Sequence, residues 1–288
     1  MVTYRLNNGV FIPSVGLGTY KLTEPQICEE SIITALNAGY RMIDTAQAYG
    51  NESYIGDAIK KSNIPREELF LTTKVWFTNH GKDLTYNSVM ESMKKLGVNY
   101  LDMVLIHWPF GDYYSAWRDL ERLYSEGKVR TIGVSNFEPD RLVDLIMFNK
   151  IVPSINQVEA NIFCQQKNSC EWMKKYGIQQ MAYSPLGQGK INDIYNLSEV
   201  QIISRKHKKT PAQVMLRFLI QNNFIVIPRS VKKEHIIENI DIFDFALNQD
   251  EMDLLKTLDK AIPIIGKSAD PNNVESAANW VNKLDIKI

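Results

Sequence analysis

The sequence predicts an α/β fold: a single (β/α)8 TIM barrel over residues 1–288, with an N-terminal β-hairpin and a C-terminal tail over one end. Short apolar runs alternate with amphipathic segments of helix length, which is typical of βαβ units and a parallel sheet. Eight such runs favour a closed barrel over an open sheet. No Pro- or Ser-rich linker divides the chain, and 288 residues is an ordinary length for one barrel domain.

The predicted strands begin with a hairpin. Thr3–Leu6 and Val10–Ile12 are strand-like and flank the tight-turn signal Asn7-Asn8-Gly9. Several of the runs that follow lack polar alternation, as expected of strands buried on both faces. The predicted barrel strands are Val15–Thr19, Met42–Asp44, Leu69–Lys74, Asp102–His107, Thr131–Ser135, Ile155–Glu159, Gln180–Tyr183 and Phe224–Ile227.

Helices are predicted between the strands, and one helix start is especially clear. Thr210 is a favoured N-cap, Pro211 suits the first helical position, and Gln213 completes a capping box. A second helix, Lys233–Ile240, follows the last predicted strand. From about Ala261 the alternation ends, so we expect the remaining tail to pack over one end of the barrel.

The charge and cysteine content restrict the possible partners. Lys plus Arg and Asp plus Glu each number 33, and this balance argues against broad binding to nucleic acids or anionic membranes. No apolar run predicts a signal peptide or a membrane span. The three cysteines form no C-x-x-C pair, which predicts free thiols in a reducing cytoplasm. We expect a cytoplasmic monomer or weak dimer that acts on a small molecule.

Polar residues stand at the ends of the predicted strands, where barrel enzymes assemble their active sites. Asp44, Lys74 and His107 end three successive strands, and Tyr49 lies in the loop after the first of these. Taken singly, each has an ordinary structural explanation, such as a solvated lysine or a packed histidine. Together, on adjacent strands of one rim, they form an acid–base group and favour a catalytic site.

Four motifs carry a family resemblance. Within Gly39–Glu52, Asp44-Thr45-Ala46 precedes Tyr49-Gly50-Asn51-Glu52; the other motifs are Leu105–Pro109, Gly127–Phe137, and Ile227–Ser230 with Glu238-Asn239 downstream. In order and spacing, from about residue 5 to residue 260, they resemble the aldo-keto reductases. The short segment after His107 is similar to compact microbial members such as the diketogluconate reductases. The resemblance implies an oxidoreductase that transfers hydride from NADPH to the carbonyl of aldehydes or small ketones and dicarbonyls, giving alcohols.

The resemblance also implies catalytic roles. Tyr49 would donate the proton that the developing alkoxide needs. Bringing the phenol pKa from about 10 to neutrality needs roughly 4 kcal/mol, which an ammonium at about 4 Å supplies at an intermediate dielectric. Lys74 is the expected ammonium, and Asp44 would hold it charged while offsetting part of its field, so that the net shift is of either sign. His107 would orient the carbonyl oxygen and assist its protonation.

The cofactor residues implied by the resemblance are Ser135, Asn136, Gln157, Tyr183, Ser184, Leu186, Arg229, Ser230, Lys232, His235, Glu238 and Asn239. The first three would hydrogen-bond the nicotinamide carboxamide, and Tyr183 would stack on the ring. The residues from Arg229 onward would hold the adenosine end, where a strand end followed by a helix suits a phosphate. His235 stands where the family pattern has an arginine. We therefore expect a weakened preference for NADPH, with NADH also accepted.

Aromatic residues are expected to wall the substrate pocket. The candidates are Tyr20, Trp76 and Trp108, with Trp280 in the tail a weaker one; for Tyr20 and Trp280 a place in the core is an equally good interpretation. No third glycine follows Gly16-Leu17-Gly18, so a Rossmann fingerprint is absent, and the four histidines lack metal-ligand spacing. No metal is expected.

Two functions of other classes compete with this interpretation. One is a cofactor-binding redox sensor or module with little turnover, and the other is an unrelated barrel enzyme such as an isomerase. The complete set of Asp44, Tyr49, Lys74 and His107 argues against the first, because a binding module needs no proton donor. The expected nicotinamide and phosphate residues argue against the second.

Overall fold

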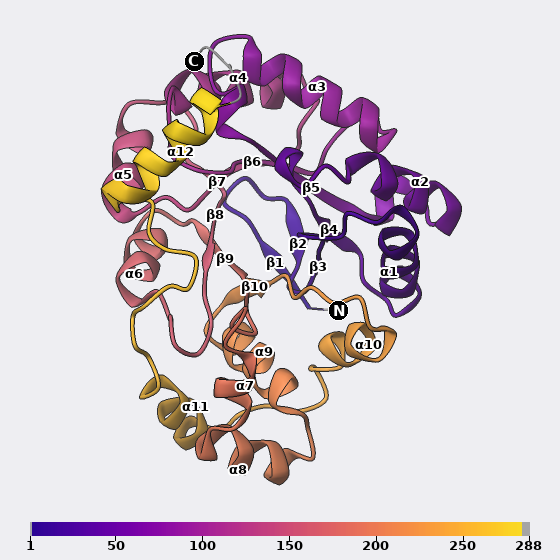
Figure 1. The fold of residues 1–288 in the computed structure, drawn as a ribbon, viewed down its shortest axis with the longest axis vertical. Coiled ribbons are helices and arrows are strands. Elements are labelled where there is room, and N and C mark those ends of the chain that lie inside the picture. The colour runs from indigo at the N-terminus through magenta and orange to yellow at the C-terminus, as the bar shows by residue number, and fades with distance from the viewer. Residues whose placement is uncertain (1, 284–288) are drawn as a thin grey trace.

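The barrel is closed by parallel pairing throughout. The computed structural model describes residues 2–283, and their side chains to residue 279. Eight parallel strands follow one another in chain order around the sheet, as Figure 1 shows. The backbones of Val15 and Val226 pair in parallel and join the first strand to the last. The strands are β3 (Leu17–Gly18), β4 (Met42–Asp44), β5 (Phe70–Val75), β6 (Met103–Ile106), β7 (Ile132–Ser135), β8 (Ile155–Glu159), β9 (Gln179–Tyr183) and β10 (Phe224–Val226).

The predicted (β/α)8 barrel is therefore confirmed, with its first strand shorter than expected. That strand was predicted over Val15–Thr19 but is regular only at Leu17–Gly18. Its glycines permit unusually close packing. A Cβ on Gly18 would lie 2.7 Å from the backbone oxygen of Ile227, and one on Gly16 would lie 2.4 Å from the side chain of Met42. Because a side chain would not fit at either position, the strand approaches its neighbours more closely than a regular strand does.

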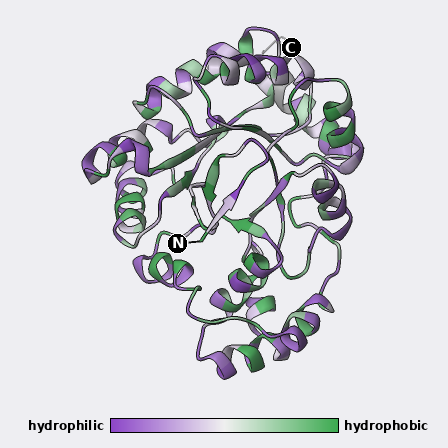
Figure 2. Ribbon diagram, turned by 180° about the vertical axis from the view of Figure 1, so that it is seen from behind, coloured by the Kyte–Doolittle hydropathy of each residue, from purple (hydrophilic) through white to green (hydrophobic). Residues whose placement is uncertain are grey.

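Helices surround the barrel (Figure 1). Apolar residues concentrate on the strands and on the helix faces that cover them, as Figure 2 shows. The predicted capping box is confirmed, since Thr210 Oγ1 accepts from Gln213 N at 3.3 Å and Gln213 Oε1 accepts from Thr210 N at 3.0 Å. The helices are α1 (Pro25–Asn37), α2 (Glu52–Ser62), α3 (Leu84–Leu96), α4 (Tyr113–Ser125), α5 (Pro139–Met147), α6 (Lys167–Lys175), α7 (Ile191–Tyr195), α8 (Ser198–His207), α9 (Pro211–Gln221), α10 (Lys233–Ile240), α11 (Gln249–Lys256) and α12 (Pro271–Lys283).

The N-terminal hairpin plugs one end of the barrel. Its strands, β1 (Thr3–Arg5) and β2 (Phe11–Pro13), pair antiparallel as predicted. Leu6 and Ile12 from the hairpin pack on the side chains that fill the barrel interior, including Met103 and Met181. Complete burial of a side chain such as Ile12 contributes roughly 1.5–3 kcal/mol. The carboxyl ends of the strands are left at the opposite end of the barrel.

The C-terminal tail packs over the carboxyl end, as expected. Ala277 of α12 contacts the aromatic cluster built around Phe77 and Phe110. The segment before α12 is bound through two backbone amides, Ile264 N and Ile265 N, which each donate to the Glu159 carboxylate at 2.8 Å.

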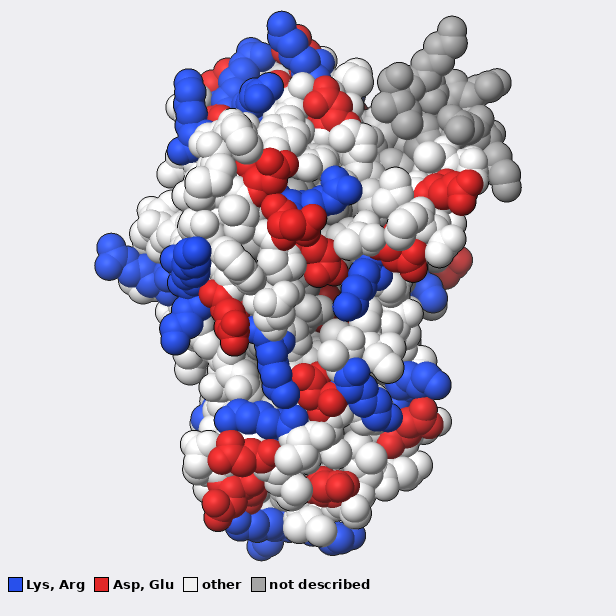
Figure 3. Space-filling model, turned by 90° about the vertical axis from the view of Figure 1, so that its left-hand side faces the viewer, with Lys and Arg blue, Asp and Glu red and all other residues white. Residues whose placement is uncertain are grey.

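On the face of the molecule in Figure 3, acidic and basic side chains are interspersed. Among the described residues, no helix is both long and apolar enough to cross a bilayer.

Candidate active site

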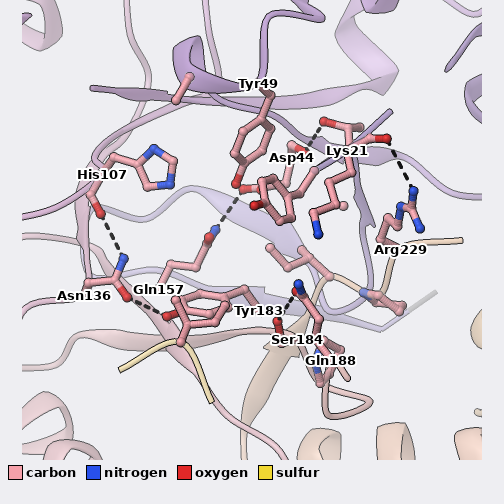
Figure 4. Close-up of a pocket in the computed structure, with 18 of the residues that line it drawn as sticks. Lys21, Asp44, Tyr49, His107, Asn136, Gln157, Tyr183, Ser184, Gln188 and Arg229 are labelled. Carbon is pink, nitrogen blue, oxygen red and sulfur yellow. Dashed lines mark hydrogen bonds between the residues drawn. The ribbon is translucent and has the colours of Figure 1, made fainter. Parts of the chain in front are cut away.

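A cavity of about 980 Å³ opens at the carboxyl ends of the strands. Its floor and walls come from strand ends and from the loops that follow them (Figure 4). The cavity brings together most of the residues singled out from the sequence. Those lining it are Tyr20, Asp44, Tyr49, Trp76, His107, Trp108, Asn136, Gln157, Tyr183, Ser184, Leu186 and Arg229. Lys74 and Ser135 lie just beneath, fully buried at the ends of β5 and β7.

Asp44 and Lys74 form a buried ion pair under the floor of the cavity. The Lys74 ammonium donates to Asp44 Oδ1 and, at 3.0 Å, to the backbone oxygen of Thr45. Gln157 Nε2 donates to the other oxygen of Asp44 at 2.8 Å. Burial lowers the pKa of Lys74 and raises the pKa of Asp44, and the attraction between the two groups opposes both shifts. Removing one partner would leave the other as an unpaired buried charge, which proteins tolerate poorly.

Tyr49 stands above this pair, at the end of the short 3-10 turn η1 (Gln47–Tyr49). The centroid of its ring lies 5.1 Å from Lys74 Nζ and 5.7 Å from the His107 ring. Burial raises the pKa of Tyr49 well above its usual value, and the charge of Asp44 raises it further. The sequence left the direction of the net shift open, and the structure gives an upward shift of the Tyr49 pKa. Tyr49 is a neutral phenol with a proton to give.

His107 is the other group that faces Tyr49. Its ring is buried, 5.0 Å from the Trp76 ring by centroids. Burial, followed by the charges of Lys74 and His80, holds the pKa of His107 well below its usual value. The imidazole is therefore neutral at pH 7, with one nitrogen able to donate. Its Nδ1 has no hydrogen-bond partner among the described residues.

A run of hydrogen bonds joins the ends of β7, β8 and β9 at the base of the cavity. Ser135 Oγ donates to the backbone oxygen of Gln157 at 2.9 Å. Asn136 Nδ2 donates to Ser135 Oγ at 3.0 Å and to the backbone oxygen of His107 at 2.9 Å. Tyr183 donates to Asn136 Oδ1 at 2.7 Å (Figure 4). This network fixes a polar edge beside the phenol ring of Tyr183.

The residues expected at an adenosine site lie farther out. Arg229 lines the cavity, and its guanidinium donates to the backbone oxygen of Lys21 at 3.4 Å. Ser230 Oγ accepts from Lys232 N at 3.1 Å just before α10, the helix predicted over Lys233–Ile240. Glu238 accepts from the Thr210 hydroxyl. Of the candidates from Arg229 onward, only Arg229 lines the cavity; the others are Ser230, Lys232, His235, Glu238 and Asn239.

Aromatic side chains form the opposite wall. Trp76 packs at 4.3 Å from Phe77 and Trp108 stacks at 5.4 Å on Phe110, by ring centroids. Tyr20 lies at the edge, 5.1 Å from the Tyr49 ring by centroids and partly open to solvent. The side chain of Trp280, the weaker candidate, lies outside the described residues. No group of three or more histidine, cysteine or acidic residues within the described chain could hold a metal ion.

Comparison with known protein families shows to which family this chain belongs. The model of the aldo/keto reductase family matches residues 14–260. The chain belongs to the aldo/keto reductase family. The family resemblance inferred from the four motifs is thereby confirmed, and the matched residues run from the first barrel strand to just beyond α11.

Individual relatives agree with the family assignment. The chain is 45% identical over 259 residues to a glyoxal reductase of Bacillus subtilis, covering 90% of this chain and 93% of the relative. An aldo-keto reductase structure from a deep-sea metagenome library matches with a TM-score of 0.91 at 40% identity, covering 93% and 99% of the two chains. The Bombyx mori aldo-keto reductase in complex with NADP matches with a TM-score of 0.87 at 32% identity, covering 95% and 96%. This chain is an NAD(P)H-dependent oxidoreductase that reduces carbonyl groups.

Several residues lining the pocket of this reductase escaped the sequence analysis. Gln47 lies two positions before Tyr49, inside the motif Gly39–Glu52. A glutamine at that position did not by itself indicate a contact with the pocket. Ile265 comes from the tail, where the strand–helix rhythm had ended. Others line the loops between the aromatic wall and the far end of the cavity: Lys21, Thr78, Asn79, Gln188 and Gly189.

Proposed function

We propose that Asp44, Tyr49, Lys74 and His107 carry out the proton transfer in carbonyl reduction by this enzyme, with Tyr49 as the donor. The observation that carries the proposal is the position of a neutral phenol between a neutral imidazole and a buried ammonium. Reduction of a carbonyl consumes one hydride and one proton. Tyr49 is a half-buried group in the cavity that holds a transferable proton beside both a hydrogen-bond donor and a positive charge.

Each of these residues would have a separate role in the reaction. When bound, NADPH supplies the hydride. The neutral His107 ring would donate a hydrogen bond to the carbonyl oxygen and orient it toward Tyr49. Tyr49 would then pass its proton to that oxygen and become a phenolate, which a proton from solvent restores. Lys74, about 5 Å from the ring, would stabilise the phenolate by roughly 3 kcal/mol at an effective dielectric constant of about 20.

The cavity fits a nicotinamide dinucleotide. It extends from the Tyr49 end past the Tyr183 phenol to the loop containing Gly187 and Gly189, both with positive φ, and on to Arg229. Ser135, Asn136 and Gln157 would hold the carboxamide. The Ser135 hydroxyl, the Asn136 amide and the backbone oxygen of Gln157 already form a polar edge beside Tyr183. Ser184 and Leu186 would line the path of the pyrophosphate. The adenosine end would lie against Arg229, Ser230, Lys232, His235, Glu238 and Asn239.

The preferred cofactor is proposed to be NADPH, with NADH also used. Arg229 and Lys232 supply positive charge near the start of α10, where a 2′-phosphate would lie. His235 is proposed to supply less, because an imidazole lacks the permanent charge of a guanidinium. An arginine in its place would carry a permanent charge and a planar fork suited to phosphate.

The substrates are proposed to be aldehydes and small ketones or dicarbonyls. The Trp76 and Trp108 wall is apolar and lies directly beside His107. The connection from β6 to α4 spans only residues 107–112, too short to build a deep extension over the pocket. A relative at 45% identity is named for glyoxal, a small dicarbonyl.

The proposal also covers the domain organisation, cellular location, oligomeric state and partners of the enzyme. We place residues 1–288 in one domain and the protein in the cytoplasm as a monomer or weak dimer, without nucleic-acid or membrane partners. Three cysteines without a disulfide, Cys28, Cys164 and Cys170, support a reducing compartment. The intermixed charges of the face in Figure 3 support the absence of a nucleic-acid surface there.

One assay tests the proposed function. Purified protein is mixed with NADPH, and consumption of the cofactor is followed before and after addition of a panel of aldehydes, dicarbonyls and ketones. We expect consumption only when a carbonyl is present, fastest with small aldehydes and dicarbonyls. Cofactor that binds but is not consumed with any carbonyl would instead identify a sensor or binding module.

A further inference from the structure

Gln47 is a cavity-lining residue with no role in the proton transfer proposed above. It begins the η1 turn that ends at Tyr49. Its side-chain oxygen accepts from Trp76 N at 3.1 Å and from Asn79 Nδ2 at 2.9 Å. Its side-chain nitrogen donates to Ser88 Oγ at 3.1 Å and to Ser92 Oγ at 3.2 Å. One amide therefore connects the η1 turn to both the loop after β5 and helix α3.

The orientation of this amide follows from its partners. A backbone N–H such as that of Trp76 can only donate, so the oxygen of Gln47 must face it and the nitrogen must face the serines. The hydroxyl of Ser88 is consistent with this orientation. It donates its own hydrogen to the backbone oxygen of Thr85 at 2.9 Å, so toward Gln47 it acts as an acceptor. Both donor hydrogens and both acceptor positions of the amide are used. Gln47 therefore has no hydrogen-bonding capacity left for a substrate or cofactor.

The η1 turn is held on its other side by Asn51. Asn51 Nδ2 donates to the backbone oxygens of Thr19 and Leu22, at 2.9 and 3.2 Å. Asn51 Oδ1 accepts from the Thr45 hydroxyl at 2.8 Å. Tyr49 thus stands on a short turn that is tied toward β3 by Asn51 and toward β5 and α3 by Gln47. The tie through Gln47 also includes the backbone of Trp76, which forms the substrate wall.

We infer that Gln47 is a positioning residue that fixes the Tyr49 phenol relative to the Trp76 wall, so that proton donor and substrate site keep one geometry. The inference rests on the proposed role of Tyr49. Reactions that depend on a fixed approach distance lose rate steeply when one group shifts. Without Gln47, the η1 turn loses its connections to Trp76, Asn79, Ser88 and Ser92. The cofactor residues on β7, β8 and β9 remain in place.

The principal test compares Gln47→Met and Gln47→Glu with the wild-type enzyme. Methionine has similar length but forms none of the four hydrogen bonds, and we expect kcat to fall about 10- to 100-fold while Kd for NADPH changes less than about twofold. Glutamate keeps the acceptor for Trp76 and should restore part of that loss. The pH profile of kcat should also shift in Gln47→Met, because the surroundings of the phenol change. Gln26→Met removes an exposed glutamine whose side chain donates to Glu30, and it is the matched control.

A second route avoids changing Gln47 itself. Ser88→Ala with Ser92→Ala removes both acceptors of the Gln47 amide nitrogen. We expect this double change to lower kcat in the wild-type background and to have little further effect in the Gln47→Met background. Equal effects in both backgrounds would overturn the inference, and so would a Gln47→Met enzyme that keeps wild-type kcat and pH profile and loses only thermal stability. If Tyr49→Phe retained turnover, the proposed function would fail instead, so the two failures are distinguishable.

Discussion

Lys74 Nζ lies 5.1 Å from the centroid of the Tyr49 ring, yet its observed hydrogen bonds go to Asp44 and to the backbone oxygen of Thr45. The ammonium therefore acts on the phenol through space. Its effect is small while Tyr49 is neutral and grows as the phenolate develops, because only the charged form is attracted. If Tyr49 donates the proton as proposed, this arrangement favours the state that follows proton transfer over the resting state, which is what transition-state stabilisation requires.

Replacing Tyr49 with phenylalanine should abolish reduction. The ring is kept, but the transferable proton is lost, and a positioned general acid contributes typically about 10²- to 10⁴-fold in rate. We expect kcat to fall by at least about 100-fold, with Kd for NADPH nearly unchanged. Steady-state kinetics and cofactor titration provide the measurement. Tyr86→Phe, which removes the hydroxyl of a half-buried tyrosine bonded to Glu126, serves as the control. Near-wild-type turnover of Tyr49→Phe would remove Tyr49 from the mechanism.

The barrel was predictable because its strands are local patterns. Runs such as Ile155–Glu159 are buried on both faces, and each ends at a polar residue or a turn signal. The irregular first strand was less predictable, because its boundaries depend on contacts of Gly16 and Gly18 with residues distant in sequence. The sequence revealed which residues gather at the rim, since parallel strands bring their carboxyl ends to one edge.

Other features of the site depend on tertiary contacts that no local pattern records. Gln47 is bonded to Ser88 and Ser92 of α3, about 40 residues farther along the chain. The direction of the Tyr49 pKa shift depends on burial and on the charge of Asp44. Neither the contacts of Gln47 nor the direction of the Tyr49 pKa shift follows from residue type or spacing.

The buried histidine His80 should make stability sensitive to acid. Its Nδ1 lies 2.7 Å from the backbone oxygen of Phe110, and burial lowers its pKa to about 4. Between pH about 6.5 and about 4 the unfolded chain takes up a proton at this histidine and the folded protein does not, so unfolding is favoured as the pH falls. The contribution is roughly 3 kcal/mol, from about 1.4 kcal/mol per pKa unit.

The measurement is the free energy of unfolding of wild type and His80→Asn across this pH range. The wild type should lose stability relative to the variant as the pH falls from 6.5 to 4, with the difference constant above pH 7. A difference independent of pH would show that His80 keeps its ordinary pKa in the folded protein. Replacement of the exposed His235 by asparagine is the control.

Replacing His235 with arginine should strengthen the preference for NADPH. A guanidinium near the start of α10 would offer a 2′-phosphate a permanent charge and a planar pair of donors, which an imidazole lacks. Kd for NADPH should fall selectively, while Kd for NADH serves as the internal control. If the ratio of the two constants stays unchanged, His235 does not govern cofactor choice and Lys232 or Lys233 compensates.

Substrate size should matter more than substrate charge. Trp76 and Trp108 wall the pocket. The connection from β6 to α4 is too short to extend over a large ligand. Specificity constants should therefore favour aldehydes and small activated dicarbonyls over bulky ketosteroids, measured across one panel with saturating NADPH. Steroid ketones emerging as the best substrates would show that this interpretation of the loop is wrong.

The segment before α12 should depend on Glu159 for its position. Both oxygens of this buried carboxylate accept backbone amides of the segment, those of Ile264 and Ile265, and Ile265 lines the cavity. In Glu159→Gln, one of these acceptors becomes an NH2 group that faces an N–H, so one hydrogen bond is replaced by a repulsive contact. Hydrogen exchange at both amides should accelerate, and KM for larger aldehydes should change more than KM for glyoxal. Glu126→Gln, at the exposed end of α4, is the matched control. Unchanged exchange at Ile264 and Ile265 would show that other contacts hold the segment over the barrel.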